Sequence, residues 1–227
     1  MTSQRLLIIN PNSNETVTQG LRESLANDIN KLSIEIECVT LPEGPFGIET
    51  DEDISSVIPL IQARIDSSPQ FDAYVIACYS DPGLEECRNM TEKFVLGIQR
   101  SALETAISIG NCIGVLALSA QSIARHSSYI EALGFTKQFA GELPLDISVD
   151  EATNDSTTLR KIISQGRRLI DEFDVDVLIL GCAGMAAHRQ AAEAALQVPT
   201  IDPTQAAISQ AAELLSLSKH PIFVAQS

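Results

Sequence analysis

The chain has 227 residues, of which 44% are hydrophobic and 20% charged, so it can form one large globular domain or two small ones. Its formal net charge of −15 argues against binding to nucleic-acid backbones and anionic membranes, because both would repel it. The apolar run at residues 6–9 is too short for a signal-peptide core, and no segment reaches the ~20 apolar residues of a membrane helix, so we expect a cytoplasmic protein.

Short apolar runs alternate with longer amphipathic stretches, a pattern typical of parallel α/β proteins. The segment 42–47 is rich in turn formers and predicts a loop. In the first half we expect, in chain order, a strand at 6–10, a helix from Ser13 or Asn14 to about residue 30, a strand at 34–41, a helix at 51–66 that Pro59 strains or kinks, a strand at 73–78 and a helix at 84–89.

The second half repeats the alternation, and no linker rich in Gly, Ser or Pro divides the chain. Here we expect a strand at 112–118, a helix from Ser119 to about residue 133, a strand near 136–140, a helix at 157–173, a strand at 177–182, a helix at 185–196, a short strand at 198–201, a helix at 203–217 and an edge strand at 221–225. We expect two related lobes, residues 1–96 plus 200–227 and residues 97–199.

Two cysteines occupy matching sequence frames, one in each half of the chain. Cys78 and Cys182 each end an apolar run that begins with an aspartate six residues earlier, at Asp72 and Asp176, and each precedes a turn. Such frames are typical of buried strands whose last residue emerges where a loop leads into a helix. The repeat predicts that the two thiols meet at one point, as in a two-base active site.

Four predicted strands end in small or polar residues, at Asn10, Cys78, Ser119 and Cys182, and a helix follows each one. In open parallel sheets, ligands bind outside these ends of the strands. Free N–H groups and the helix dipole lower the pKa of a nearby thiol. From an ordinary pKa of ~8.5, a decrease of about one or two units would make either cysteine a competent base.

Other interpretations of these residues stay open. A cysteine that closes a buried strand is often a packing residue, and we favour this role for Cys38, Cys87 and Cys112. Turn formation could equally explain the asparagines at 10 and 12, and helix capping could explain Ser119.

The sequence offers few further catalytic groups. The five cysteines are an odd number and include no C-x-x-C pair, so they predict no disulfide framework. The histidines are too scattered for a metal motif, and no glycine loop for binding phosphate is present, so the sequence predicts neither a metal site nor a nucleotide site. We expect no cofactor, and we expect His126 and His188 at the surface. No Arg or Lys lies near either cysteine in the sequence, which favours a neutral ring over a free carboxylate as the substrate.

Four motifs together resemble the aspartate/glutamate/hydantoin racemase superfamily, and within it the hydantoin and allantoin racemases. The motifs follow one another in order and span nearly the whole chain: Ile-Asn-Pro-Asn-Ser at 9–13, Gly-Pro-Phe-Gly-Ile-Glu at 44–49, Ala-Cys-Tyr-Ser-Asp-Pro-Gly-Leu at 77–84 and Leu-Gly-Cys-Ala-Gly-Met at 180–185.

The resemblance implies two pseudo-symmetric three-layer α/β lobes with parallel sheets, an active site in the cleft between them and no cofactor. It makes Cys78 and Cys182 an acid–base pair that flanks the α-carbon of a small-molecule substrate. The residues that it places around the substrate are Asn10, Pro11, Ile48, Tyr79, Ser80, Ala183 and Gly184, with Ser119 in a similar role. It also suggests a homo-oligomer.

Our main hypothesis is a cofactor-independent racemase of 5-substituted hydantoins or allantoin. We expect backbone N–H groups at residues 79, 80, 183 and 184 to hold the enolate oxygen, helped by the Ser80 hydroxyl and Asn10. Within the superfamily, the alternatives are an aspartate/glutamate-type racemase, a maleate isomerase and an arylmalonate decarboxylase-like enzyme. A protein that binds or senses a ligand and keeps inert cysteines is the alternative from another class. A redox switch would need a disulfide between Cys78 and Cys182, whereas a bound substrate needs these sulfurs apart.

Overall fold

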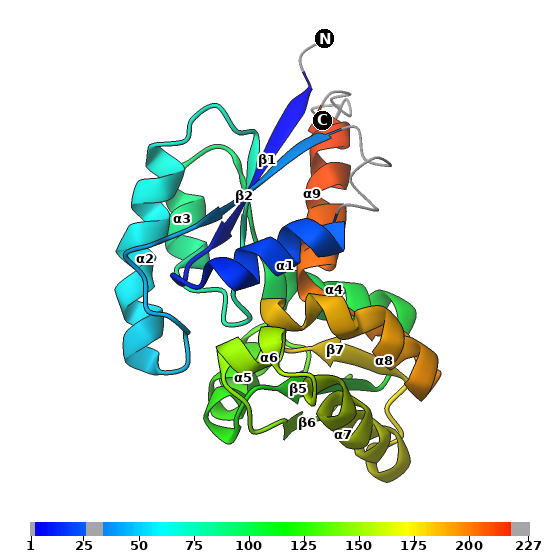
Figure 1. Cartoon of the computed structure of the whole chain (residues 1–227). Coiled ribbons are helices and arrows are strands. Elements are labelled where there is room, and N and C mark those ends of the chain that lie inside the picture. Colours follow the sequence, from blue (N-terminus) through cyan, green and yellow to red (C-terminus); the bar gives the residue numbers. More distant parts are fainter. Residues whose placement is uncertain (1–2, 26–33, 219–227) are drawn as a thin grey trace, which may run out of the picture.

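The computed structural model describes residues 3–25 and 34–218, which form two α/β lobes, one above the other in Figure 1. The strands of these residues are β1 (Gln4–Asn10), β2 (Ile34–Thr40), β3 (Ala73–Ile76), β4 (Phe94–Gly97), β5 (Ile113–Ala117), β6 (Phe139–Pro144), β7 (Val177–Leu180) and β8 (Thr200–Ile201). The helices are α1 (Glu15–Leu25), α2 (Asp51–Asp66), α3 (Leu84–Met90), α4 (Ile98–Ile109), α5 (Ala120–Ala132), α6 (Val149–Asn154), α7 (Thr158–Phe173), the 3-10 helix η2 (Ala183–His188), α8 (Arg189–Leu196) and α9 (Pro203–Ser218).

The two sheets share one plan. Each is parallel throughout, with the order β2-β1-β3-β4 in the first and β6-β5-β7-β8 in the second. In each sheet, the two strands at the centre of the order are therefore the first and third in the chain, and their carboxyl ends lie side by side. This arrangement confirms the predicted fold class of two pseudo-symmetric α/β lobes.

Helices cover both faces of each sheet because the central strands are apolar on both sides. One cluster of buried side chains joins α2 and α3 to the first sheet, and another joins α7 and α8 to the second. A third cluster includes Val75 of β3, Leu103 of α4, Ile179 of β7 and Ala207 of α9, and it therefore fills the space between the sheets. Full burial of such a side chain contributes roughly 1.5–3 kcal/mol, so these clusters hold the lobes together.

Local sequence explains where two helices begin near the site. Thr50 and Asp53 form a capping box at the start of α2, and the helix continues past Pro59 to Asp66 without a break. Ser119 is the N-cap of α5, where its Oγ accepts a hydrogen bond of 3.3 Å from the Ser122 N–H.

Several elements differ from the sequence-based expectations. We did not predict β4 and α4, because the strand leads into the helix at Gly97 without an intervening loop. We also did not predict α6. The strand expected near 136–140 is β6, which lies further along the chain because Gly134 adopts a positive φ of 78° and a turn occupies the next residues. The expected edge strand at 221–225 lies outside the described residues.

The end of the chain connects the lobes. β8 pairs with β7 in the second sheet, whereas α9 packs against α4, β3 and β4. The lobe boundaries at residues 96 and 200 stay a prediction. Among the described residues, no helix combines the length and the apolar character that crossing a membrane requires.

Candidate active site

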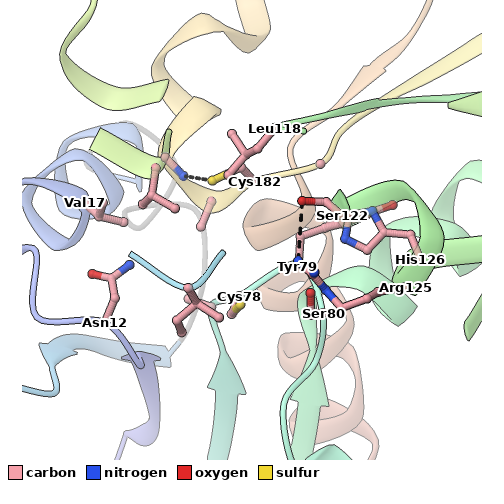
Figure 2. Close-up of a pocket in the computed structure, with 16 residues that line it drawn as sticks. Asn12, Val17, Cys78, Tyr79, Ser80, Leu118, Ser122, Arg125, His126 and Cys182 are labelled. Carbon is pink, nitrogen blue, oxygen red and sulfur yellow. Dashed lines mark hydrogen bonds between the residues drawn. The ribbon is translucent and has the colours of Figure 1, made fainter. Parts of the chain in front are cut away.

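One pocket lies where the strand ends of the two lobes meet (Figure 2). Its volume is about 450 Å³, including the opening to solvent. Segments from both halves of the chain line it: Asn12, Val17, Ile48, Ala77, Cys78, Tyr79, Ser80, Leu118, Ser122, Arg125, His126, Val149, Gly181, Cys182, Ala183 and Gly184. Predicted site residues in this set are Ile48, Cys78, Tyr79, Ser80, Cys182, Ala183 and Gly184.

The two cysteines reach the pocket from equivalent positions in the two sheets. Cys78 follows β3 and Cys182 follows β7, each two residues after its strand ends. The Gly181 N–H donates to the Leu116 carbonyl over 2.8 Å, and a Cβ at Gly181 would lie only 2.7 Å from that oxygen. Glycine therefore lets this backbone lie against β5. In Figure 2 the two thiols flank the pocket from opposite sides.

Burial raises the pKa of both thiols, opposite to the lowering that we expected from nearby helix N-termini. The pKa of Cys78 rises to about 12, mainly through burial and then through the charge of Cys182, while Arg125 and the Ser80 N–H act in the other direction. The pKa of Cys182 rises to about 11 through burial, opposed by the Gly184 N–H, which donates to its Sγ over 3.4 Å. Loss of water around the thiolate outweighs these few donors.

Three predicted binding residues lie beside the pocket and not in its lining: Asn10, Pro11 and Ser119. The Asn10 Nδ2 donates to Asn12 Oδ1 over 2.9 Å, to Thr18 Oγ1 over 3.0 Å and to the Asn14 carbonyl over 3.2 Å. Asn10 therefore holds the loop that carries Asn12 into the pocket. A direct contact of these three residues with substrate stays a prediction.

Asn12 presents its amide to the pocket. Its Oδ1 accepts two hydrogen bonds within the loop, one from the Asn10 side chain and one of 2.9 Å from the Asn14 N–H. This oxygen therefore points away from the pocket. The remaining NH₂ group is a donor at the edge of the pocket, next to the apolar side chain of Val17 (Figure 2).

One face of α5 supplies three pocket residues that the sequence analysis missed as site residues. Ser122, Arg125 and His126 have the i, i+3, i+4 spacing of neighbours on a helix, and all three line the pocket. Because Ser119 marks the start of the helix, the spacing of these three residues could have indicated that they share the helix face next to the strand end. The sequence analysis favoured a neutral substrate because no Arg or Lys lies near either cysteine in the sequence. That argument no longer holds, because the tertiary structure brings Arg125 into the same pocket.

The prediction that His126 faces solvent is wrong. Its side chain is 4% exposed, and its Nδ1 lies 2.6 Å from Oε1 of Glu142, whose side chain is fully buried. The ring of Tyr79 packs edge-on against the imidazole, with 5.0 Å between ring centroids. Burial raises the pKa of Tyr79 well above its ordinary value. His188, also expected at the surface, is half-buried, and burial lowers its pKa.

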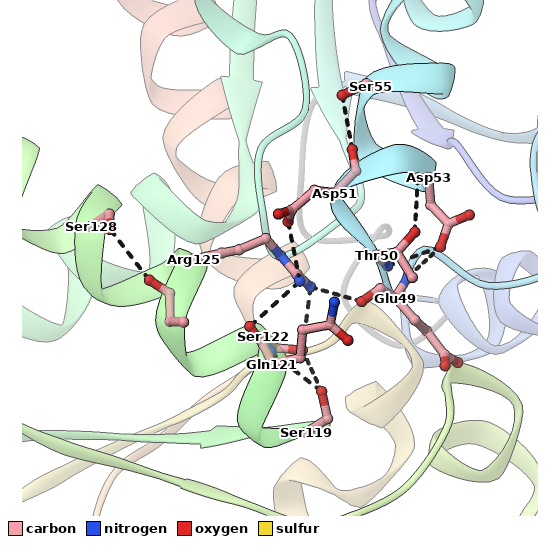
Figure 3. Close-up of polar contacts among 11 residues, drawn as sticks. Glu49, Thr50, Asp51, Asp53, Ser55, Ser119, Gln121, Ser122, Arg125 and Ser128 are labelled. Atoms are coloured by element: carbon pink, nitrogen blue, oxygen red, sulfur yellow. Dashed lines mark hydrogen bonds and ion pairs between the residues drawn. The ribbon is translucent and has the colours of Figure 1, made fainter.

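Arg125 crosses the cleft from α5 to the segment before α2 (Figure 3). Its Nη2 donates to the Glu49 carbonyl over 3.2 Å, and its Nη1 lies 3.4 Å from Asp51 Oδ1. A second bridge runs from the Val149 N–H to Glu49 Oε1 over 3.0 Å. The segment at 48–51 is thus held by residues from the second half of the chain.

Asp81 connects the Cys78 loop to the N-terminus of α4. Its carboxylate accepts the N–H groups of Gln99 over 2.9 Å and Arg100 over 2.8 Å. A Cβ at Gly97 would lie 2.2 Å from the Asp81 carboxyl carbon, so only glycine leaves room for this contact. Burial raises the pKa of Asp81 to about 6 despite these donors.

The remaining cysteines lie away from the pocket. Cys38 and Cys87 are buried in the apolar clusters, as expected of packing residues. Cys112 is partly exposed, with its thiol 3.3 Å from the Phe173 carbonyl, and is not a core residue. Among the described residues, no group of three His, Cys, Asp or Glu side chains is placed to hold a metal ion.

Comparison with known proteins gives consistent results. The family model for Asp/Glu/Hydantoin racemase matches residues 6–211. A hydantoin racemase of a Pseudomonas species is 28% identical over 218 residues, covering 95% of this chain and 87% of the relative. An uncharacterised Schizosaccharomyces pombe protein is 31% identical over 226 residues, covering 94% of this chain and 93% of the relative. The structure of an allantoin racemase from Klebsiella pneumoniae superposes with a TM-score of 0.90 at 25% identity, covering 96% of this chain and 92% of that one.

Proposed function

Because the chain belongs to the Asp/Glu/hydantoin racemase family, we propose that it is a cofactor-independent racemase of 5-substituted hydantoins or allantoin. The observation that carries the proposal is that Cys78 and Cys182, from equivalent strand ends of the two sheets, line one pocket from opposite sides. A carbon atom between two such groups can lose a proton on one face and regain one on the other.

The proposed reaction has two proton transfers. One cysteine starts as a thiolate and removes the proton from C5 of the ring, so the C–H bond breaks, an S–H bond forms and the electron pair moves into the adjacent carbonyl. The other cysteine starts as a thiol and donates its proton to the opposite face of the planar enolate. Each turnover therefore exchanges the protonation states of Cys78 and Cys182, and the next substrate of opposite configuration restores them.

The electrostatics of the pocket suit a pair that carries one negative charge. The charge of Cys182 raises the pKa of Cys78, so ionisation of one thiol opposes ionisation of the other. A buried thiolate of high pKa is sparsely populated at neutral pH. It is also a stronger base toward a carbon acid than an ordinary thiolate, and the greater basicity compensates part of the rate lost through its low population.

Donors around the pocket can stabilise the enolate oxygen. The N–H groups at Ser80 and Gly184, which we expected to do this, interact with the two sulfurs. The Asn12 NH₂ group and the N–H groups of residues 79 and 183 remain as donors, and in a buried site such preoriented donors are worth more than in water. Asn12 thus replaces Ser80 and Gly184 as the proposed partner of the developing charge.

An aspartate/glutamate-type racemase is the second candidate, and a specific observation favours it. Arg125 lines the pocket and could bind a carboxylate. Two cysteines in one pocket disfavour chemistry that uses a single thiol, as we expect of an arylmalonate decarboxylase. A binding or sensor protein would leave the substrate unchanged, so activity decides between these classes.

Exchange of the α-proton in deuterated water tests the two-thiol scheme. We expect wild-type protein to incorporate deuterium from either enantiomer of a 5-substituted hydantoin with loss of optical activity. Cys78→Ser and Cys182→Ser should each abolish racemisation, and each can retain exchange from one enantiomer only. Cys112→Ser, a cysteine outside the pocket, is the matched control and should racemise normally.

Two outcomes would contradict the proposal. Full racemisation by either single serine variant would exclude the need for two thiols. An unchanged optical signal with a 5-substituted hydantoin, allantoin, aspartate and glutamate alike would exclude a racemase of these substrates. Light scattering on the same preparation measures whether the protein is the expected homo-oligomer.

A further inference from the structure

Arg125 lines the pocket with hydrogen-bonding capacity to spare. Its side chain is 17% exposed, and its Nε is buried without a hydrogen-bond partner among the described residues. Its terminal nitrogens make only long contacts: 3.2 Å to the Glu49 carbonyl, 3.4 Å to Asp51, and 3.5 Å to both the Gln121 carbonyl and Ser122 Oγ. Charge-assisted hydrogen bonds of arginine are usually about 2.7–2.9 Å long, so these contacts leave much of the guanidinium available.

The pocket therefore carries an arginine whose buried Nε–H has no hydrogen-bond partner among the described residues. A buried donor without a partner is unfavourable, and a ligand that supplies an acceptor removes this penalty. The other charged residue at the rim, Asp51, is 80% exposed and its interaction with Arg125 is weakened by solvent. A ligand oxygen inside the pocket is a better-shielded partner than Asp51.

The position of Arg125 relative to the thiols identifies the part of the substrate that it can reach. Cys78 and Cys182 take the two faces of the ring, so the planar enolate and its substituent lie between them. In Figure 2, Asn12 and Arg125 lie on opposite sides of the line between the sulfurs. Protein groups that lie in the plane of the enolate ring contact both enantiomers alike, as a racemase requires. A group above or below that plane would favour one enantiomer.

Asn12 and Arg125 suit different ends of such a substrate. The neutral amide of Asn12, beside Val17, suits a carbonyl of the neutral ring. Arg125 reaches the rim, where its Nη1 lies 3.4 Å from the exposed Asp51 (Figure 3), so it suits a substituent that extends from the ring toward solvent.

We propose that Arg125 determines the specificity of this racemase by binding an acceptor oxygen on the C5 substituent of the substrate. The substrate class is then a hydantoin whose substituent carries a ureido group, as in allantoin, or a carboxylate group. A hydrocarbon substituent is a poor replacement because it leaves the Nε–H unpaired. This inference rests on the proposed function. A site built to hydrogen-bond its substrate commonly rejects an analogue without the group by a factor of about 100 or more.

Three hydantoins with substituents of equal heavy-atom number test the inference: the 5-ureido, 5-carboxymethyl and 5-isobutyl compounds. Circular dichroism follows racemisation of each single enantiomer and gives kcat/KM. For wild-type protein we expect the better of the two acceptor-bearing substrates to exceed the isobutyl compound at least about 100-fold. The ureido and carboxymethyl arms show which acceptor the site prefers.

Substitution of the arginine then assigns the preference to this residue. Arg125→Met keeps the aliphatic stem and should reduce the ratio to less than about 10-fold, while Arg125→Lys should restore part of it for the carboxylate. Asp51→Ala removes the ion pair at the rim without removing the donors, and Arg168→Met makes the same substitution on the exposed surface of α7. Both controls should keep the wild-type ratio.

The outcomes separate this inference from the proposed function. A wild-type preference for the isobutyl compound, or an equal loss of all three activities in Arg125→Met and Arg125→Lys, would overturn the role of Arg125 while racemisation itself stands. No racemisation of any of the three compounds by wild-type protein would overturn the proposed function and this inference with it. If Arg125→Met fails to fold, the wild-type ratio and Arg125→Lys still decide.

Discussion

The pH at which Cys78 and Cys182 ionise follows directly from their burial. Burial raises the pKa to about 12 for Cys78 and to about 11 for Cys182. At pH 8 these values correspond to thiolate fractions of roughly 10⁻⁴ and 10⁻³, compared with roughly 10⁻¹ for an unperturbed thiol. Because only the thiolate is alkylated, we expect reaction with iodoacetamide to be roughly 100-fold to 1,000-fold slower than in the unfolded chain.

Peptide mapping by mass spectrometry after timed alkylation measures each cysteine separately. Between pH 7 and pH 10 the rate at Cys78 should rise roughly tenfold per pH unit, because each unit increases the thiolate fraction tenfold. At about pH 11, where Cys182 ionises, Cys182→Ser removes the neighbouring charge and should make the Cys78 thiolate more abundant than in wild type. Cys112→Ser provides the control, and its Cys78 profile should match wild type.

Two results would refute this reasoning. Alkylation of Cys78 at pH 7.5 within about tenfold of the unfolded rate would mean that burial does not control its pKa. An unchanged Cys78 alkylation rate in Cys182→Ser at about pH 11, where Cys182 is charged in wild type, would mean that the two sulfurs do not interact. The same pH dependence should appear in kcat/KM for racemisation, which is expected to increase from pH 7 toward alkaline pH.

Two further predictions concern the residues around the pocket. His126→Leu leaves the buried Glu142 side chain without its partner, so we expect the free energy of unfolding in urea to fall by about 3 kcal/mol, whereas a fall below about 0.5 kcal/mol would contradict a stabilising pair. For Asp81, the folded pKa of about 6 lies above its ordinary value of 3.8, so its contribution to stability is complete below pH 4 and is lost as the pH rises through 6. Wild type should therefore lose up to about 3 kcal/mol more than Asp81→Asn between pH 4 and pH 7, and parallel urea stability curves for the two proteins would disprove this assignment.

Local sequence determined the class of the fold and the position of the two thiols. Apolar runs followed by turn residues mark β3 and β7, and the cysteines lie at fixed offsets after them, so no long-range information is needed. β4 and α4 were harder to find because Gly97 ends the strand and caps the helix at once, which leaves no loop to separate two different periodicities. The short strand expected at 198–201 contains β8, but two residues are too few for a periodicity that would locate its start.

The chemistry of the pocket depended on how the two sheets face each other. The sequence shows Cys78 before a helix and suggests a lowered pKa, but the protein packed around it removes water from the thiolate, and this effect is larger. Likewise, Arg125 and His126 read as a polar, exposed stretch, because nothing local reveals that their helix face meets residues from the other half of the chain. Strand and helix periodicity is a local property of the backbone, whereas burial and electrostatic environment are set by neighbours that are distant in sequence. The sequence alone therefore determined most of the elements and the cysteine frames, and only the tertiary structure decided the charge and shape of the site.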